Sequence, residues 1–249
     1  MLVAFSGGQD SALLFKVCAL ILPADKVLAV TAVSATYPKS ELAKAKVLAG
    51  KIGAKLKVIR TGELNNKKFT ANPLKRCYYC KKELFSRLLT IAKQNKLNFV
   101  LEASNLSDKQ DYRPGTVAKC ELKIKSPLIQ AGFNKEDIRS LSKKLGLTSW
   151  NKPSLACLAS RIPYGVKITA TLLKRIDQAE EYLNSLGFDQ VRLRHYNGLC
   201  RIEVNKSNLQ RLLGSREKIV KRLKALGYNY ITLDLEGYRT GSLNEVINR

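Results

Sequence analysis

Strand-like apolar segments alternate with amphipathic helix patterns through the first 150 residues. The segments at residues 3–5, 26–35, 55–61 and 98–103 are expected to be strands, and the second is rich in Val and Ala, as strands buried on both faces are. Helical patterns follow at residues 12–21, 40–52, 83–94 and 135–145, with Ser40 as a helix cap. This alternation predicts an α/β fold with a doubly wound parallel sheet, which binds ligands outside the carboxyl ends of its strands.

The last hundred residues show a different order of elements. Loop residues at 148–153 precede a helical pattern at 170–186, a hairpin at 190–205 that turns at Asn197-Gly198, a helix at 207–226 and a strand at 230–235. This order predicts a second, smaller α+β domain. The expected domains therefore span residues 1–150 and 151–249.

A glycine-rich turn joins the first strand to the first helix. It reads SGGQDS, with Ser6, Gly7, Gly8, Asp10 and Ser11 as its characteristic residues. Adjacent glycines let the backbone approach a ligand, and a helix N-terminus supplies unpaired N–H donors, so the turn predicts an anion site, most often for phosphate. The Gly-Lys-Ser/Thr ending of a Walker loop is absent.

The charge of the chain is strongly positive. Lys and Arg number 44 against 20 Asp and Glu, a net charge of +24. A nucleic-acid partner is one interpretation, but the lysines are spread along the chain, which favours a solvated basic surface. No apolar run reaches the roughly 18 residues needed to span a bilayer and no signal peptide is present, so we expect a cytoplasmic protein without membrane contact.

Six cysteines in a cytosolic-looking chain argue against a disulfide framework. We expect Cys18 and Cys200 in the core and Cys120 in a lysine-rich strand without a readable role. Cys77 and Cys80 form a CxxC in a loop at residues 72–82, compatible with zinc, iron–sulfur or redox use. No second CxxC exists and His195 is the only histidine, so a [4Fe–4S] cluster with Cys157 as third ligand fits better than zinc.

Several motifs occur together along essentially the whole chain. They are SGGQDS, NPLKRCYYCKKELF, SNLSDKQDYRPG, KPSLACLASRIPYG, VRLRH with RIEV, and LDLEGYRTGSLN. Their order resembles the ATP-dependent sacrificial sulfur transferases of the LarE family, in the PP-loop ATP pyrophosphatase superfamily. Members of this family thiolate the carboxylates of a pyridinium dicarboxylate mononucleotide, the precursor of the nickel-pincer cofactor of lactate racemase.

The resemblance implies ATP, Mg²⁺ and a phosphorylated pyridinium carboxylate as ligands, and a homo-oligomer as the assembly. The turn would hold pyrophosphate, and Asp10 would help to organise Mg²⁺. Adenylation makes a carboxylate reactive because AMP is a good leaving group, which a sulfur nucleophile then displaces. Residues 151–249 would bind the substrate and form the oligomer.

The source of the sulfur differs between branches of the family. In one branch a single cysteine, matching Cys157, gives up its own sulfur and becomes dehydroalanine. In the other branch three cysteines hold a [4Fe–4S] cluster that carries a sulfide on its open iron. The presence of Cys77 and Cys80 beside Cys157 favours the cluster branch.

The resemblance also assigns charged residues to the substrate. Arg192, Arg194 and Arg239 would hold the phosphate of the mononucleotide, since arginine forks suit phosphate. Ser160 and Arg161 would place the reacting carboxylate. Glu180 and Glu203 are candidates for binding Mg²⁺ or for orienting those arginines. Asp108 and Asp111 are candidates for binding Mg²⁺ or for the adenine-side loop.

Other activities remain open at this point. A PP-loop tRNA thiolase would explain the basic charge, although nucleic acid is not the favoured partner. An amide-forming PP-loop synthetase would leave the three cysteines without a role. A binding module without activity would leave ATP uncleaved.

Overall fold

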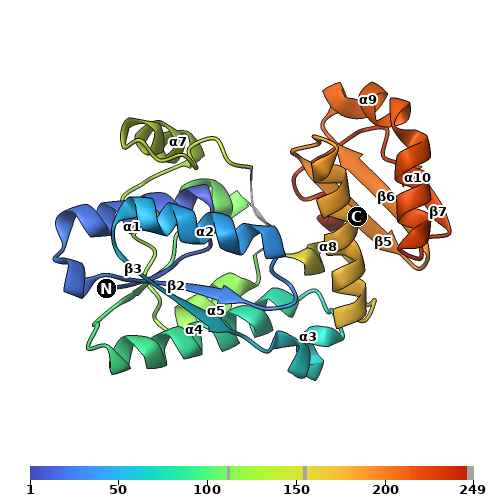
Figure 1. Ribbon diagram of the computed structural model, residues 1–249. Coiled ribbons are helices and arrows are strands. Elements are labelled where there is room, and N and C mark those ends of the chain that lie inside the picture. Colours follow the sequence, from blue (N-terminus) through green and yellow to red (C-terminus); the bar gives the residue numbers. More distant parts are fainter. Residues whose placement is uncertain (111–112, 154–155, 246–249) are drawn as a thin grey trace. The chain divides into compact units, whose positions relative to one another are not determined.

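A computed structural model describes residues 1–110, 113–153 and 156–245, without the side chains of residues 39, 109 and 110. Contacts divide the chain into two compact units, Met1–Leu155 and Ala156–Arg249, which are described separately (Figure 1). No helix in the described ranges combines the length and the apolar character that crossing a membrane requires.

The first unit is built on a parallel sheet of four strands. They are β1 (Leu2–Ala4), β2 (Leu28–Val33), β3 (Lys55–Arg60) and β4 (Val100–Leu101), in the order β3-β2-β1-β4. Since β1 pairs with β2 on one side and β4 on the other, the strand order reverses at β1. Ligands of such sheets bind at this reversal, outside the carboxyl ends of the strands. The expected α/β fold is confirmed, and the glycine-rich turn follows β1 at this position.

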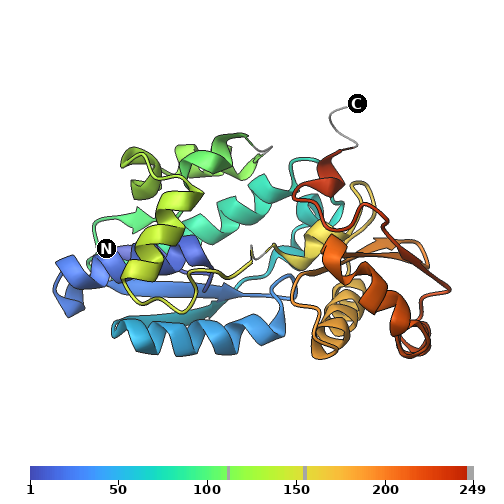
Figure 2. The ribbon, with the colours of Figure 1, turned by 90° about the horizontal axis from the view of Figure 1, so that it is seen from above.

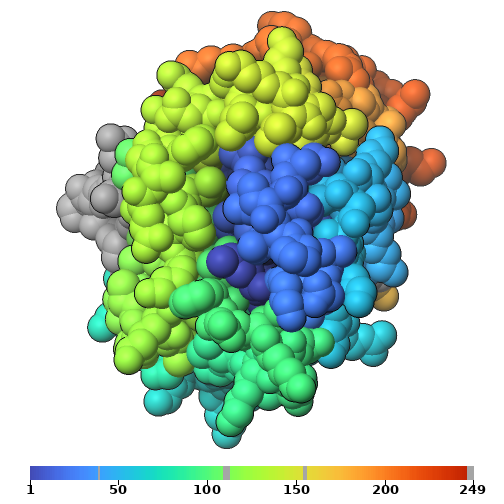
Figure 3. All heavy atoms as spheres, turned by 90° about the vertical axis from the view of Figure 1, so that its left-hand side faces the viewer, coloured from blue at the N-terminus to red at the C-terminus, as the bar shows by residue number. Residues whose placement is uncertain are grey.

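Helices cover both faces of this sheet (Figure 1). On one face lie α1 (Gln9–Ile21), α2 (Lys39–Ile52) and α7 (Lys135–Lys144), whose apolar side chains share one core cluster. Figure 2 shows α2 alongside the strands that it connects, and Figure 3 shows α1 flanked by α2 and by the segment around α7. On the other face α4 (Arg76–Gln94) packs through Phe85 and Leu88, and α5 (Gly115–Glu121) packs on α4. Two short helices complete the unit, α3 (Lys67–Thr70) and α6 (Pro127–Gln130).

Over its described residues, the second unit combines a sheet of three strands with three α-helices. The hairpin of β5 (Val191–Tyr196) and β6 (Leu199–Val204) turns at Asn197-Gly198, as the sequence predicts, and β7 (Tyr230–Leu233) pairs parallel to β6. Both turn residues have positive φ, as a two-residue hairpin turn of type I′ requires. The helices are α8 (Ala170–Ser185), α9 (Leu209–Gly214) and α10 (Arg216–Ala225).

Two predictions about the cysteine segments are wrong. Residues 76–82 are not a loop, because α4 begins at Arg76 and carries Cys77 and Cys80 in its first turns. Nothing in this stretch stops a helix, and the buried Arg76 guanidinium donates to Asn72 Oδ1 at 2.7 Å, which fixes the helix start. Cys120 lies in helix α5 rather than in a strand, because this helix packs on α4.

Three predicted element boundaries also differ from the structure. Helix α2 begins at Lys39 after Pro38, so Ser40 is not its cap. The helix expected at 207–226 is interrupted at Ser215 between α9 and α10. The strand expected at 98–103 pairs with β1 only at β4, Val100–Leu101, because the chain then leaves the sheet for the polar loop that follows.

Candidate functional site

The turn after β1 is held by its own hydroxyl and backbone groups. Ser6 Oγ and Ser11 Oγ lie 3.1 Å apart, the Ser6 amide donates to Ser11 Oγ at 3.2 Å, and the Gly8 amide donates to Ser6 Oγ at 3.3 Å. Gly8 is the N-cap residue of α1, with no side-chain cap bond to the first amides of that helix. The turn therefore presents amides and hydroxyls together at a helix N-terminus, an arrangement that suits an anion.

Gly7 occupies a position that only glycine fits. Its φ is +73°, in the left-handed region, and a Cβ added there would lie 2.8 Å from the Cβ of Ala45 in α2. Tyr37 donates from its hydroxyl to the Ser6 carbonyl at 2.9 Å. Contacts from α2 and from the segment before it thus fix the turn from outside.

An amide and two carboxylates meet where α1 begins. Asn105 Nδ2 donates to Asp10 Oδ1 at 3.3 Å, and the Asn105 backbone amide donates to Asp108 Oδ2 at 3.1 Å. Arg113 pairs with Asp108 at 2.9 Å. Burial raises the pKa of Asp10, the Lys135 charge opposes this shift, and the Asp108 charge adds to it. The Asp10 carboxyl therefore lies where a nearby cation would stabilise its ionised form.

The amide group of Asn105 that donates to Asp10 also carries one oxygen, Oδ1. Asn105 is fully buried, and its Oδ1 has no hydrogen-bond partner among the described residues. A buried amide oxygen without a partner is costly, whereas amide and carboxylate oxygens are the ligands that Mg²⁺ prefers. Asp10, Asp108 and Asn105 therefore offer suitable donor chemistry for a hard cation, whereas Asp111 lies outside the described residues.

Glu102 anchors the loop that carries Asn105. Its carboxylate accepts from the Ser104 amide at 3.1 Å and the Ser104 hydroxyl at 2.6 Å, from Lys119 Nζ at 3.1 Å, and from the Ser126 hydroxyl. Burial opposes its ionisation, but the hydroxyls of Ser104 and Ser126 and the charge of Lys119 outweigh burial and lower the pKa of Glu102. An ionised Glu102 thus fixes the loop at the carboxyl end of β4.

Cys77 and Cys80 lie three residues apart at the start of α4, so they share one face of the helix. Both are partly buried. Cys80 Sγ lies 3.8 Å from Oε1 of the buried Glu63, which also accepts from Thr61 Oγ1 at 3.0 Å. The helix supplies two sulfur donors from one face, a set that suits iron or zinc chemistry.

No complete metal centre is assembled within the described ranges. There, no group of three or more His, Cys, Asp or Glu side chains is arranged to hold a metal ion. The two sulfur atoms on α4 would supply only part of the donor set that a [4Fe–4S] cluster requires. Cys157, its predicted third ligand, belongs to the other unit.

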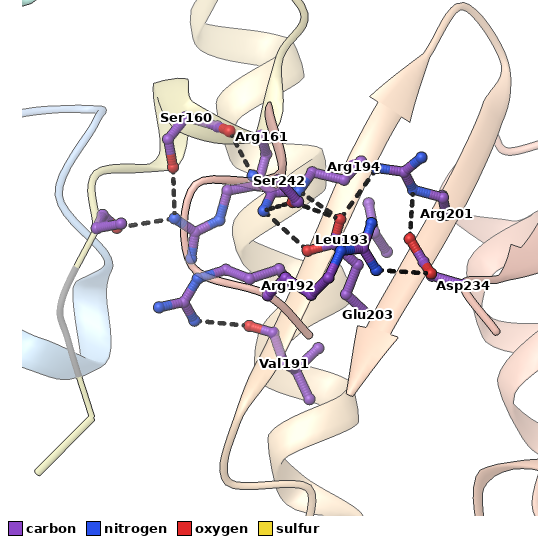
Figure 4. A network of polar contacts seen from close by, with 12 residues as sticks. Ser160, Arg161, Val191, Arg192, Leu193, Arg194, Arg201, Glu203, Asp234 and Ser242 are labelled. Atoms are coloured by element: carbon purple, nitrogen blue, oxygen red, sulfur yellow. Dashed lines mark hydrogen bonds and ion pairs between the residues drawn. The ribbon is translucent and has the colours of Figure 1, made fainter. Parts of the chain in front are cut away.

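In the second unit Cys157 is exposed at the start of a single helical turn, Leu158–Arg161. Arg161 holds this turn, because its Nη1 donates to the Ala156 carbonyl at 2.9 Å, the Cys157 carbonyl at 3.1 Å and Ser160 Oγ at 2.9 Å. Its other nitrogens form a bidentate pair with Glu180 at 2.9 and 2.8 Å. A buried guanidinium thus ties the cysteine segment to α8 (Figure 4).

A second buried arginine lies beside this turn (Figure 4). Arg194 makes a bidentate pair with Glu203 at 2.9 and 2.8 Å, and donates to the Ser160 carbonyl at 2.7 Å and Ser242 Oγ at 2.8 Å. Glu203 is fully buried and also accepts from Arg201 at 3.1 Å. Glu203 therefore contacts one of the three predicted phosphate ligands, whereas Glu180 contacts Arg161.

Arg192 and Arg239 complete the set of predicted phosphate ligands. Arg192 stacks on the Tyr238 ring, with 5.4 Å to its centroid, and donates to the Val191 carbonyl at 2.7 Å. Burial first, and then the charge of Arg161, lower the pKa of Arg192, so a bound anion would stabilise its charged form. Arg239 pairs with three carboxylates at 3.0–3.2 Å, those of Asp234, Glu236 and Glu245.

The remaining cysteines do not share these surroundings. Cys18 and Cys200 are buried in the cores of the two units, and burial raises the pKa of both thiols, that of Cys200 to about 12. Cys120 is exposed on α5. The buried pair matches the core role that the sequence predicts.

Three residues near these sites were not assigned roles from the sequence. Asn105 contacts Asp10, Glu63 contacts Cys80, and Lys152 contacts the carbonyl of Gly7 at 3.0 Å. Asn105 and Lys152 do lie inside the motifs SNLSDKQDYRPG and KPSLACLASRIPYG, and this was the only signal available. Sequence spacing does not reveal such contacts, since each joins segments that are distant in the chain.

Comparisons with known proteins extend over both units, although no family model matches the chain. A pyridinium-3,5-bisthiocarboxylic acid mononucleotide synthase of Lactiplantibacillus plantarum is 38% identical over 247 residues, 99% of this chain and 90% of that protein. An uncharacterized protein of Synechocystis sp. is 41% identical over 250 residues, 100% of this chain and 93% of that protein. Another, of Methanocaldococcus jannaschii, is 30% identical over 240 residues, 96% of this chain and 91% of that protein.

Proposed function

The chain belongs to the LarE family of ATP-dependent sulfur transferases, and we propose that it thiolates a pyridinium dicarboxylate mononucleotide for nickel-pincer cofactor synthesis. The observation that carries this proposal is 38% identity, over 99% of the chain, to a synthase of the bisthiocarboxylic acid mononucleotide. The anion-binding turn and the arginine cluster of the second unit supply the two kinds of site that the reaction needs. A cytoplasmic location and a homo-oligomeric state belong to the same proposal as family features.

The turn after β1 binds the pyrophosphate end of ATP. Its amides and the hydroxyls of Ser6 and Ser11 face the phosphates, while the N-terminus of α1 favours negative charge. Asp10, Asp108 and Asn105 Oδ1 would hold Mg²⁺, whose charge would support ionisation of the buried Asp10 and offset the negative charge that develops on the departing pyrophosphate. Asn105 fixes Asp10 through its amide group.

The arginine cluster orients the mononucleotide. Arg192 and Arg239 contact its phosphate, Arg194 supports them from its buried pair with Glu203, and Glu180 holds the neighbouring guanidinium group of Arg161 in place. Arg161 keeps the turn of Cys157 in a fixed conformation and, with Ser160, places the reacting carboxylate. This division of roles follows from burial, because Arg161 and Arg194 are 2% and 5% exposed whereas Arg192 is half-buried.

The attacking sulfur comes from one of two sources. Cys77, Cys80 and Cys157 would hold a [4Fe–4S] cluster, which when bound supplies a sulfide for displacement of AMP. Alternatively, the Cys157 thiolate attacks the adenylated carboxyl carbon, AMP leaves, and loss of the Cα proton breaks the Cβ–S bond to leave dehydroalanine. The two thiols on α4 favour the first source, and the exposed position of Cys157 is compatible with both.

Anaerobic purification followed by iron and sulfide analysis tests the source. We expect iron, sulfide and visible absorption in the wild-type protein, their loss in Cys80→Ala, and an unchanged protein mass after turnover. The matched control is Cys120→Ala, which removes an exposed thiol from a neighbouring helix and should retain the iron. If the protein contains no iron and Cys157 loses the mass of one H₂S after turnover, Cys157 itself is the source of the sulfur and the cluster is excluded as the source.

A further inference from the structure

Lys152 reaches the glycine turn from a distant part of the chain. Its Nζ donates to the Gly7 carbonyl oxygen at 3.0 Å and also contacts Glu41 Oε2. Nearby, the side-chain amide of Gln9 donates to the Trp150 carbonyl. The segment at 150–152 is thus attached twice to the start of α1 and the turn before it.

Lys152 contacts the peptide group between Gly7 and Gly8, whose N–H can donate a hydrogen bond to an anion. The Gly7 carbonyl and the Gly8 N–H belong to one planar trans peptide, so they point in opposite directions. A cation that holds the carbonyl therefore directs the Gly8 N–H to the other side, where it now donates to Ser6 Oγ at 3.3 Å. Glycine at both positions leaves this peptide free to rotate unless something holds it.

Glu41 balances the charge of Lys152. Its carboxylate, 7% exposed, contacts Lys152 through Oε2 and Lys44 through Oε1, the latter at 3.0 Å. Burial opposes ionisation of Glu41, but the hydrogen bonds from Lys152 and Lys44 outweigh burial and lower its pKa. The ionised Glu41 carboxylate therefore holds the Lys152 ammonium group beside the Gly7 carbonyl.

We propose that Lys152 is a positioning residue that orients the Gly7–Gly8 peptide, so that the Gly8 N–H faces the pyrophosphate of ATP. This inference rests on the proposed role of the turn in binding pyrophosphate. It assigns to Lys152 an effect through the backbone, without contact between its ammonium group and the phosphates.

Lys44 provides a matched control for the test. It carries the same charge, pairs with the same carboxylate and lines the same pocket of about 400 Å³ beside the turn, but among the described residues its ion pair is with Glu41 alone. Lys152→Met and Lys44→Met each remove one cationic partner of Glu41. Only the first removes the hydrogen bond to Gly7.

The experiment measures binding of magnesium pyrophosphate to the full-length protein by calorimetry, and follows the Gly8 amide by ¹⁵N NMR. We expect Lys152→Met to weaken binding about tenfold or more, the effect of losing one charge-assisted hydrogen bond. The Gly8 amide signal should no longer respond to pyrophosphate in this variant. Lys152→Arg, which keeps a cationic donor, should restore most of the affinity, and Lys44→Met should stay within about twofold of wild type.

Two results would overturn the inference while leaving the proposed function intact. They are wild-type affinity in Lys152→Met, and equal weakening in Lys152→Met and Lys44→Met. If the wild-type protein binds neither pyrophosphate nor ATP, the role of the turn is itself wrong, and the inference is overturned with it.

Discussion

Two buried arginines of the second unit, Arg161 and Arg194, each have a carboxylate partner that accepts hydrogen bonds from two of their nitrogens. Arg161 and Arg194 both make bidentate carboxylate pairs, and their remaining donors reach the backbone of the turn that carries Cys157. Breaking such a pair by removing one partner typically costs about 3–5 kcal/mol, because a charge is left buried. At the residue scale, these arginines therefore act first as structural supports of the site.

His195, the only histidine, provides a pH-dependent prediction at this scale. It is 7% exposed in β5, and its Nδ1 has no hydrogen-bond partner among the described residues. Burial, and then the charge of Arg175, lower the pKa of His195 from 6.5. As pH falls through 6.5, the unfolded chain binds a proton that the folded protein does not, so stability decreases by up to about 1.4 kcal/mol per pH unit.

Urea unfolding between about pH 7.5 and about pH 5.5 measures this effect. We expect His195→Phe to unfold with a smaller pH slope than the wild-type protein, since the variant has no histidine. The amino terminus, whose pKa burial also lowers, is the same in both proteins, so the difference isolates His195. Parallel pH profiles in the two proteins would contradict the prediction.

At the scale of elements, the start of each helix decides which side chains reach the sites. Because α4 begins at Arg76, Cys77 and Cys80 are held on a helix face. The start of α7 places Lys135 within electrostatic range of Asp10. The starts of α4 and α7 therefore determine the surroundings of the cysteine pair and of Asp10.

The start of α7 contains a capping box, which makes a second prediction. Asn134 Oδ1 accepts from the amides of Glu136 and Asp137 at 2.7 and 3.0 Å, and Asp137 Oδ2 accepts from the Asn134 amide at 3.0 Å. Asn134→Ala should lower stability by about 1 kcal/mol, and should speed amide exchange in α7. Asn134→Asp keeps an acceptor and should behave like the wild type; equal exchange in all three proteins would refute the role of the cap.

At the scale of the whole molecule, the charge of +24 is the observation that favours a nucleic-acid substrate. A small phosphorylated substrate needs only the few cations of the sites described above. We therefore expect tRNA to bind no more tightly than an unrelated RNA of equal length, with the salt dependence of non-specific binding. Filter binding over a salt titration measures this, with the Arg192→Gln variant as a comparison.

The same binding experiment would give a different result for a tRNA thiolase. A tRNA thiolase would prefer tRNA over the unrelated RNA at about 0.15 M salt, where non-specific contacts are largely screened. It would also release AMP in the presence of tRNA without any pyridinium carboxylate. Either result would show that the substrate is tRNA and not a pyridinium carboxylate.

The sequence by itself determined the α/β fold, the glycine-rich turn after the first strand and the hairpin of the second unit. These features depend on local chemistry: glycines where the backbone needs them, apolar runs for buried strands, and Asn197-Gly198 for a two-residue turn. The family followed from the order of motifs, and the identity to known proteins confirmed it.

Tertiary structure alone decided how the residues of the sites are supported. The partners of Asp10, Cys80 and Gly7 lie 95, 17 and 145 residues away in the chain. The beginning of α4 and the helical state of Cys120 also depended on packing between α4 and α5. Local propensity is weak compared with such contacts, because a buried hydrogen bond or apolar contact formed across the fold outweighs the small preferences of single residues.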